Sequence, residues 1–78
     1  YDLIWKSLSP AEQQLVRYIV SSEAGKVSEI KTQMLHPSGF DSLRERLINK
    51  HLINTEERGY VRIDLPRFRE YVLLWHSD

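Results

Sequence analysis

The spacing of apolar residues changes once along this chain, and that change limits the folds that it can adopt. Up to Lys50 the apolar residues recur every three or four positions, as on one face of an α-helix. Residues 52–55 and 60–63 then have the composition of two short β-strands around a turn-rich tip. A last helical pattern follows, with Phe68 and Tyr71 on its apolar face. At 78 residues the chain has room for one core, so we predict a single, mostly helical α+β domain.

Three residues mark the start of the first long helix. Ser9 is a good N-cap, Pro10 suits the first helical position, and Glu12 completes a capping box. The helical spacing assigns Leu15 to the buried face and Glu12 to the opposite, polar face. Gly25, which can adopt positive φ, is expected to close the segment that follows the helix.

Two further helices are predicted before the hairpin. After a brief strand contact at Val27, a short helix runs to residues 36–37, where a proline ends it. The next helix covers about residues 39–50, and Ser38 with Asp41 resembles a weak capping box at its start.

The two ends of the chain are also predicted to contain helical segments. Residues 1–8 either form a short helical turn, with Trp5 packed against the main body, or fray. At the other end, Asp64 is expected to cap a helix whose buried face is supplied by Phe68, Tyr71, Val72, Leu74 and Trp75.

The charge balance gives the chain as a whole no attraction for nucleic acid. Eleven Lys and Arg residues match eleven Asp and Glu residues, so the formal net charge is zero. The lack of cysteine excludes a disulfide framework and favours an intracellular protein. No apolar run is long enough to cross a bilayer, and the chain opens at Tyr1 without a signal peptide. We therefore expect a cytoplasmic domain, cut from a longer protein, that does not contact membranes.

The residue patterns that mark an enzyme are missing from the sequence. Three scattered glycines do not form the Gly-rich turn of a phosphate-binding loop. No Ser–His–Asp set and no pair of carboxylates can be argued from spacing. His36, His51 and His76 lie too far apart to form the local pairs that bind metals. We expect no catalytic residue, no metal site and no cofactor.

The order of elements and three stretches of sequence resemble a winged helix-turn-helix domain. Residues 43–53 resemble the end of its recognition helix leading into the first wing strand, although His51 stands where many members carry glycine. Residues 8–13 and 59–75 resemble the first helix and the tail of the winged-helix domains that close certain prokaryotic AAA-type P-loop ATPases. The resemblance implies three helices, a β-hairpin wing and a C-terminal helix, in a non-catalytic module of a larger protein that contacts duplex DNA.

The helix at about residues 39–50 would carry the DNA contacts of such a domain. Arginine can bind guanine edges and asparagine adenine edges when a helix enters the major groove, and a lysine at the helix end suits a phosphate. The candidate DNA-binding residues are Ser42, Arg44, Arg46, Asn49 and Lys50 on this helix, and Arg58 at the wing tip. The alternative is a solvated helix face, because Asp41 and Glu45 lie on the same helix.

The same charges also favour a different function, contact with another protein. Residues 38–57 hold three basic and four acidic side chains, whereas a DNA-binding surface concentrates positive charge. On the C-terminal helix, Tyr71, Leu74 and Trp75 either pack in the core, in part against residues 1–5, or form a docking patch. The partner would be the ATPase domain of the parent protein or a second copy of the chain.

Overall fold

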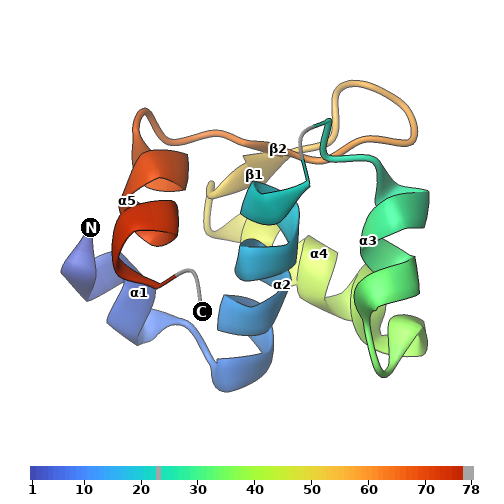
Figure 1. Cartoon of the computed structure of the whole chain (residues 1–78), viewed down its shortest axis with the longest axis horizontal. Helices are drawn as coiled ribbons and strands as arrows, with labels where there is room; N and C mark the ends of the chain where they lie inside the picture. The colour runs from blue at the N-terminus through green and yellow to red at the C-terminus, as the bar shows by residue number, and fades with distance from the viewer. Residues whose placement is uncertain (23, 77–78) are drawn as a thin grey trace.

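The computed structural model describes residues 1–22 and 24–76, and within them it contains five α-helices, one short 3₁₀ helix and a two-stranded antiparallel hairpin (Figure 1). The elements in chain order are α1 (Asp2–Ser7), α2 (Pro10–Ser21), α3 (Val27–Gln33), η1 (Pro37–Gly39), α4 (Phe40–Asn49), β1 (Ile53–Asn54), β2 (Arg62–Ile63) and α5 (Phe68–Trp75). In Figure 1, α2 passes through the middle of the molecule, with α1 and α5 on one side and α3 and α4 on the other. The predicted small, mostly helical α+β domain is confirmed.

Helix α2 begins with the predicted capping box. Ser9 Oγ accepts a hydrogen bond from the backbone N–H of Glu12 at 3.2 Å, and Glu12 Oε1 accepts one from the N–H of Ser9 at 2.8 Å. The prediction that Glu12 lies on the polar face was wrong, because its side chain turns inward and the residue is 3% exposed. The cap thus fixes the start of α2 and also places a carboxylate inside the domain.

One cluster of buried apolar side chains joins all five α-helices to the hairpin. Its members are Trp5, Leu8, Leu15, Val16, Ile19, Val20, Ile30, Phe40, Leu47, Leu52, Ile53, Val61, Phe68 and Val72. Burial of this apolar surface is the main term that favours the folded chain. Because Trp5 belongs to the cluster, residues 1–8 adopt the packed helical alternative rather than the frayed one.

The second arm of the hairpin pairs with two segments rather than one. In the hairpin itself, Ile63 lies opposite Ile53. On its other side, the N–H of Val61 donates to the carbonyl of Gly25 at 2.8 Å, and the N–H of Val27 donates to the carbonyl of Gly59 at 2.9 Å. The brief strand contact predicted at Val27 forms one residue earlier, as a bridge between Lys26 and Tyr60, and Val27 already begins α3. The bridge ties the segment between α2 and α3 to the hairpin.

The start of α4 differs from the prediction. The N-cap residue is Gly39 and makes no side-chain capping bond, so Ser38 and Asp41 do not form the expected box. Residues Pro37–Gly39 instead form a turn of 3₁₀ helix in which the N–H of Gly39 donates to the carbonyl of His36 at 3.1 Å. This turn leads directly into α4 and takes the place of a side-chain cap.

The start of α5 also differs. Asp64 was expected to cap this helix, but the helix begins only at Phe68, after Arg67 in a left-handed conformation. Asp64 still belongs to the hairpin, where its N–H donates to the carbonyl of Leu52 at 2.8 Å and its carboxylate accepts from Asn54 Nδ2 at 3.2 Å. Hydrogen bonds within the hairpin therefore occupy the carboxylate of Asp64 that was expected to cap α5.

Helix α4 ends in the geometry that glycine commonly adopts, although the residue there is His51. His51 has a φ of 62°, its N–H donates to the carbonyl of Ile48, and the N–H of Leu52 donates to that of Leu47. These bonds satisfy carbonyls that the helix end leaves open. The residue at this position is histidine instead of glycine, but the helix still ends with positive φ and the hydrogen bonds that accompany it.

Gly25 is the glycine that the fold requires most strongly, and we predict that its replacement by alanine is damaging. Its φ is 69°, and an added Cβ would lie 2.1 Å from the carbonyl oxygen of Val61. We expect Gly25→Ala to lower the free energy of unfolding by about 2–4 kcal/mol, from left-handed strain and the clash together. Urea denaturation measures this change.

Gly59 and Gly39 provide matched controls. Gly59 also has positive φ but has open space around its Cβ position, so Gly59→Ala should cost about 1 kcal/mol of strain alone. Gly39 has ordinary helical φ and open space, so Gly39→Ala should change stability by less than about 0.5 kcal/mol. Equal losses for Gly25→Ala and Gly59→Ala would contradict the proposed clash with Val61.

Candidate functional site

Helix α4 turns a polar face to solvent. Ser42, Arg46 and Asn49 are exposed, as predicted for contacts with a ligand outside the domain, and so are Asp41 and Glu45. The opposite side of the helix is anchored in the core, so these side chains project from a rigid element. The face therefore offers one guanidinium, two neutral polar groups and two carboxylates.

Arg44 lies at the edge of this face rather than on it. The residue is half-buried, and its Nε is buried without a hydrogen-bond partner among the described residues. Its outer part lines the same shallow hollow as Ser42 and Asn49. Arg44 is thus less available to an outside ligand than Arg46.

Lys50 has a partner inside the domain. Its Nζ lies 3.0 Å from Glu12 Oε2 and 3.1 Å from Oε1, so the ammonium at the end of α4 pairs with the carboxylate at the start of α2. The side chain of Lys50 is 39% exposed, whereas that of Glu12 is 5% exposed. The sequence predicted that Lys50 contacts a DNA phosphate, whereas in the structure its ammonium pairs with the Glu12 carboxylate.

The pKa of Glu12 reflects this environment. Burial raises the pKa of the carboxyl, but the hydrogen bond from the Ser9 backbone and the bond and charge of Lys50 outweigh burial, so the pKa lies below its usual value. A buried carboxylate that keeps its charge stabilises the fold only while these donors surround it.

The hairpin tip carries mixed charges. Arg58 is exposed, but Glu56 and Glu57 beside it are exposed too. Glu57 also pairs with Arg62 at 2.6 Å, and the guanidinium of Arg62 lies 5.6 Å from the centre of the Tyr60 ring. Arg58 is therefore the basic candidate that the tip presents to a ligand.

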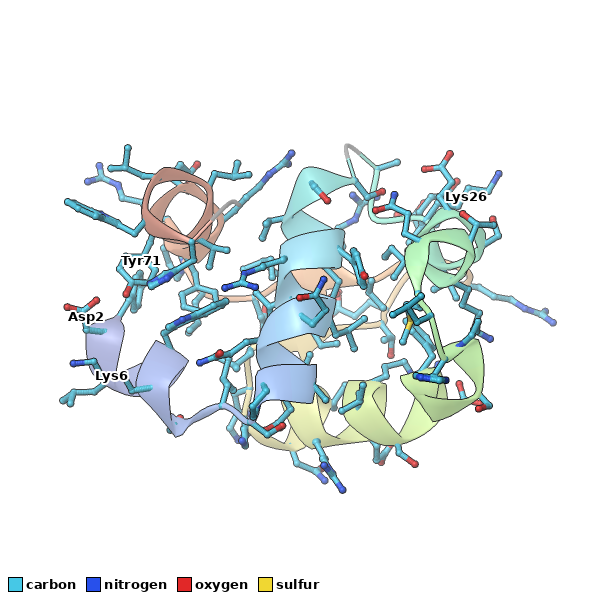
Figure 2. All side chains as sticks on the ribbon, turned by 60° about the horizontal axis from the view of Figure 1, so that its bottom comes forward. Asp2, Lys6, Lys26 and Tyr71 are labelled. Carbon is cyan, nitrogen blue, oxygen red and sulfur yellow. The ribbon has the colours of Figure 1, made fainter. Side chains whose placement is uncertain are left out.

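Tyr71 belongs to a contact between the two ends of the chain. Figure 2 shows Tyr71 of α5 next to Asp2 of α1, and the tyrosine hydroxyl donates a hydrogen bond to the Asp2 carboxylate. The same hydroxyl lies 3.0 Å from His76 Nε2, and the His76 ring stacks on Trp5 at 4.4 Å. Of the two alternatives for Tyr71, the structure favours packing against the first residues of the chain.

This contact shifts the pKa values of both partners. The hydrogen bond to Asp2 is the main cause that raises the pKa of Tyr71 to about 12, and burial and the Asp2 charge add to it. The hydrogen bond from Tyr71 lowers the pKa of Asp2, burial opposes this, and the charge of Lys6 adds to the lowering. The pair is strongest while the tyrosine is protonated and the aspartate is charged.

Leu74 and Trp75 differ from Tyr71. Leu74 is 74% exposed and Trp75 is 69% exposed, so the last turn of α5 presents two large apolar side chains to solvent. The prediction that the buried face of the last helix includes Leu74 and Trp75 was therefore wrong, because α5 turns them away from the core.

A family model described as a domain of unknown function (DUF8462) matches residues 1–72. The chain belongs to this family. The DUF8462 match includes the whole of α4 and the hairpin tip, whereas Leu74 and Trp75 follow it. No curated protein and no solved structure matches the chain.

The histidines of this DUF8462 member stay apart in the fold. Within residues 1–22 and 24–76, no group of three or more His, Cys, Asp or Glu side chains is arranged to hold a metal ion. In the same ranges, no helix has the length and apolar character that crossing a membrane requires.

The Glu12–Lys50 pair leads to a prediction about stability and pH. Lys50→Met leaves the buried Glu12 carboxylate without its cation, so we expect it to lower the free energy of unfolding at neutral pH by about 1–3 kcal/mol. The pKa of Glu12 is lower in the folded chain than the ordinary value of 4.5. Its stabilisation is therefore complete above that value and is lost as the pH falls through the folded-state pKa.

Denaturation at a series of pH values measures both effects, and two variants serve as controls. Lys6→Met removes an exposed ammonium and should change stability by less than about 0.5 kcal/mol. Glu12→Gln should remove this part of the acid dependence. The assignment would be wrong if Lys50→Met were as stable as Lys6→Met.

Proposed function

We propose that the chain is a winged helix-turn-helix domain that contacts duplex DNA through α4. The observation that carries the proposal is the polar face of α4, on which Ser42, Arg46 and Asn49 are exposed. This helix follows α3 and a short 3₁₀ turn, an order of elements that supports a helix-turn-helix. Such a helix enters the major groove and reads base edges with its outward side chains.

The order and pairing of the elements support the winged-helix part of this proposal. Helix α2 is followed by a strand contact at Lys26 and Tyr60, then by α3, the Pro37–Gly39 turn and α4. The hairpin β1–β2 follows at once, in the position of the wing. The short antiparallel pairing of three segments gives the hairpin a fixed place beside the helices.

The charges predict that DNA binding is weak. Arg46 and Arg58 are exposed, whereas Lys50 is held by Glu12 and Arg44 is half-buried. A contact that neutralises roughly two or three phosphates gives a slope of log K against log salt of about −2 to −3. Asp41 and Glu45 further reduce the electrostatic attraction to DNA that does not depend on base sequence. Contacts with the bases therefore have to provide much of the affinity.

Amide-shift NMR titration with a mixed-sequence duplex, at low and at physiological salt, tests this proposal. We expect shifts on α4 and at the hairpin tip that weaken with salt. Arg46→Ala should lower the affinity about tenfold, because a guanidinium that contacts a base or phosphate is lost. Arg69→Ala, which removes an exposed arginine from α5, is the matched control and should bind as the wild type does.

Two outcomes would contradict DNA contact. One is the absence of shifts at high duplex concentration and low salt. The other is an equal loss of affinity in Arg46→Ala and Arg69→Ala, which would indicate general charge attraction instead of an α4 interface.

A second candidate function is supported by the last turn of α5. Leu74 and Trp75 together expose more apolar surface than single scattered residues do, and such patches mark protein contacts. The partner would be the ATPase domain of a parent protein or a second copy of the chain.

Sedimentation velocity over a range of concentrations tests the second copy. If Trp75 joins two copies, the wild type should form a dimer as concentration rises and Trp75→Ala should remain monomeric. Trp75 is 69% exposed, so the variant should keep its helical circular dichroism. A monomeric wild type at all concentrations would exclude self-association through α5.

A further inference from the structure

A groove of about 660 Å³ lies between α2 and α4, and it is separate from the last turn of α5. From α2, Ala11, Leu15 and Tyr18 line it at a spacing of four and three residues, so they form one stripe along the helix. Leu43 lines it from α4, and Met34 and Leu35 line it from the segment that joins α3 to η1.

The lining contains apolar side chains that the domain leaves open to solvent. Leu35 is 89% exposed, and Tyr18, Met34 and Leu43 are only half-buried although they pack against the core. An exposed leucine at the rim of an apolar groove contributes favourable free energy only when an occupant covers it and removes it from water.

The charge around the groove selects the kind of occupant. Arg46 and His36 line it, together with the neutral side chains of Gln14 and Ser42, and none of the residues that line it is acidic. Arg46 takes part in neither of the ion pairs found among the described residues. An occupant with a carboxylate therefore complements this surface, and a basic occupant does not.

The shape of the groove suits a helix. Its walls are two helices, and the stripe from Ala11 to Tyr18 extends about 10 Å along α2, or two helical turns. A third helix that packs across two others presents aliphatic residues at positions i, i+3, i+4 and i+7.

We propose that this groove binds an acidic amphipathic helix of a partner protein. The helix places its aliphatic face on Leu15, Leu35 and Leu43 and a carboxylate beside Arg46. The interaction does not rest on DNA contact, although Arg46 belongs to both surfaces.

The test uses a synthetic, end-capped peptide of about fourteen residues, long enough for a few helical turns, with leucine at i, i+3, i+4 and i+7 and glutamate at the flanking positions. A matched peptide carries lysine at every glutamate position. In amide-shift NMR titrations, we expect the acidic peptide to shift residues 11–18 and 34–46. It should bind about fivefold more tightly than the basic peptide.

Three variants make the test specific to the groove. Leu35→Ser should weaken the acidic peptide about fivefold without loss of folding, because the leucine is already exposed. Arg46→Glu should reverse the preference, so that the basic peptide binds better than the acidic one. Leu74→Ser removes another largely exposed leucine, which lies outside the groove, and should leave both affinities unchanged.

Four results would overturn the proposal. They are an absence of shifts with the acidic peptide at millimolar concentration, equal binding of the two peptides, shifts confined to α5, and self-association of the free domain that Leu35→Ser abolishes. The last result would assign the groove to a second copy of the chain. Loss of peptide binding in Leu35→Ser with unchanged duplex binding would separate this site from the α4 interface.

Discussion

Within residues 1–22 and 24–76, the Glu12 carboxylate forms the ion pair that joins the start of α2 to the end of α4. It caps the first turn of α2 through the N–H of Ser9, and it pairs with Lys50 at the end of α4. Because α4 leads directly into the hairpin, this contact helps to set the angle between α2 and the rest of the domain. Both the polar face of α4 and the groove between α2 and α4 depend on that angle, so an ion pair with one buried partner helps to position two surfaces that face solvent.

Local signals in the sequence predicted much of the fold. The capping box at Ser9 and the helical spacing through Lys50 depend on residues close to one another in the chain, and the structure contains both. The predicted caps at Ser38 and Asp64 fail for a common reason. Before α4, a 3₁₀ turn takes the place of the expected side-chain cap. Before α5, the Asp64 side chain bonds to the hairpin instead of capping the helix. In both cases tertiary contacts decide which hydrogen bonds form.

The site was less predictable, because its decisive contacts join residues far apart in the sequence. Lys50 and Glu12 are separated by 38 positions, and Tyr71 and Asp2 by 69. Helical spacing indicates which face of α4 is polar, but it does not reveal that Lys50, at the end of this helix, is already paired with Glu12. The groove escaped prediction for the same reason, since Leu35 and Tyr18 line one groove only when α2 packs beside the segment that joins α3 to η1.

The balance of charges gives the two proposed surfaces a common physical basis. A domain with no net charge gains little from the general attraction between cations and the DNA backbone, so the proposed contact of the free domain with a duplex is expected to be weak. A tether to a second binding element raises the local concentration of the domain at its ligand and compensates for a low intrinsic affinity. A partner bound to the exposed last turn of α5, away from Arg46, would provide such a tether, whereas an acidic helix in the groove would compete with DNA for Arg46. A domain without net charge is therefore better suited to act beside a partner than alone.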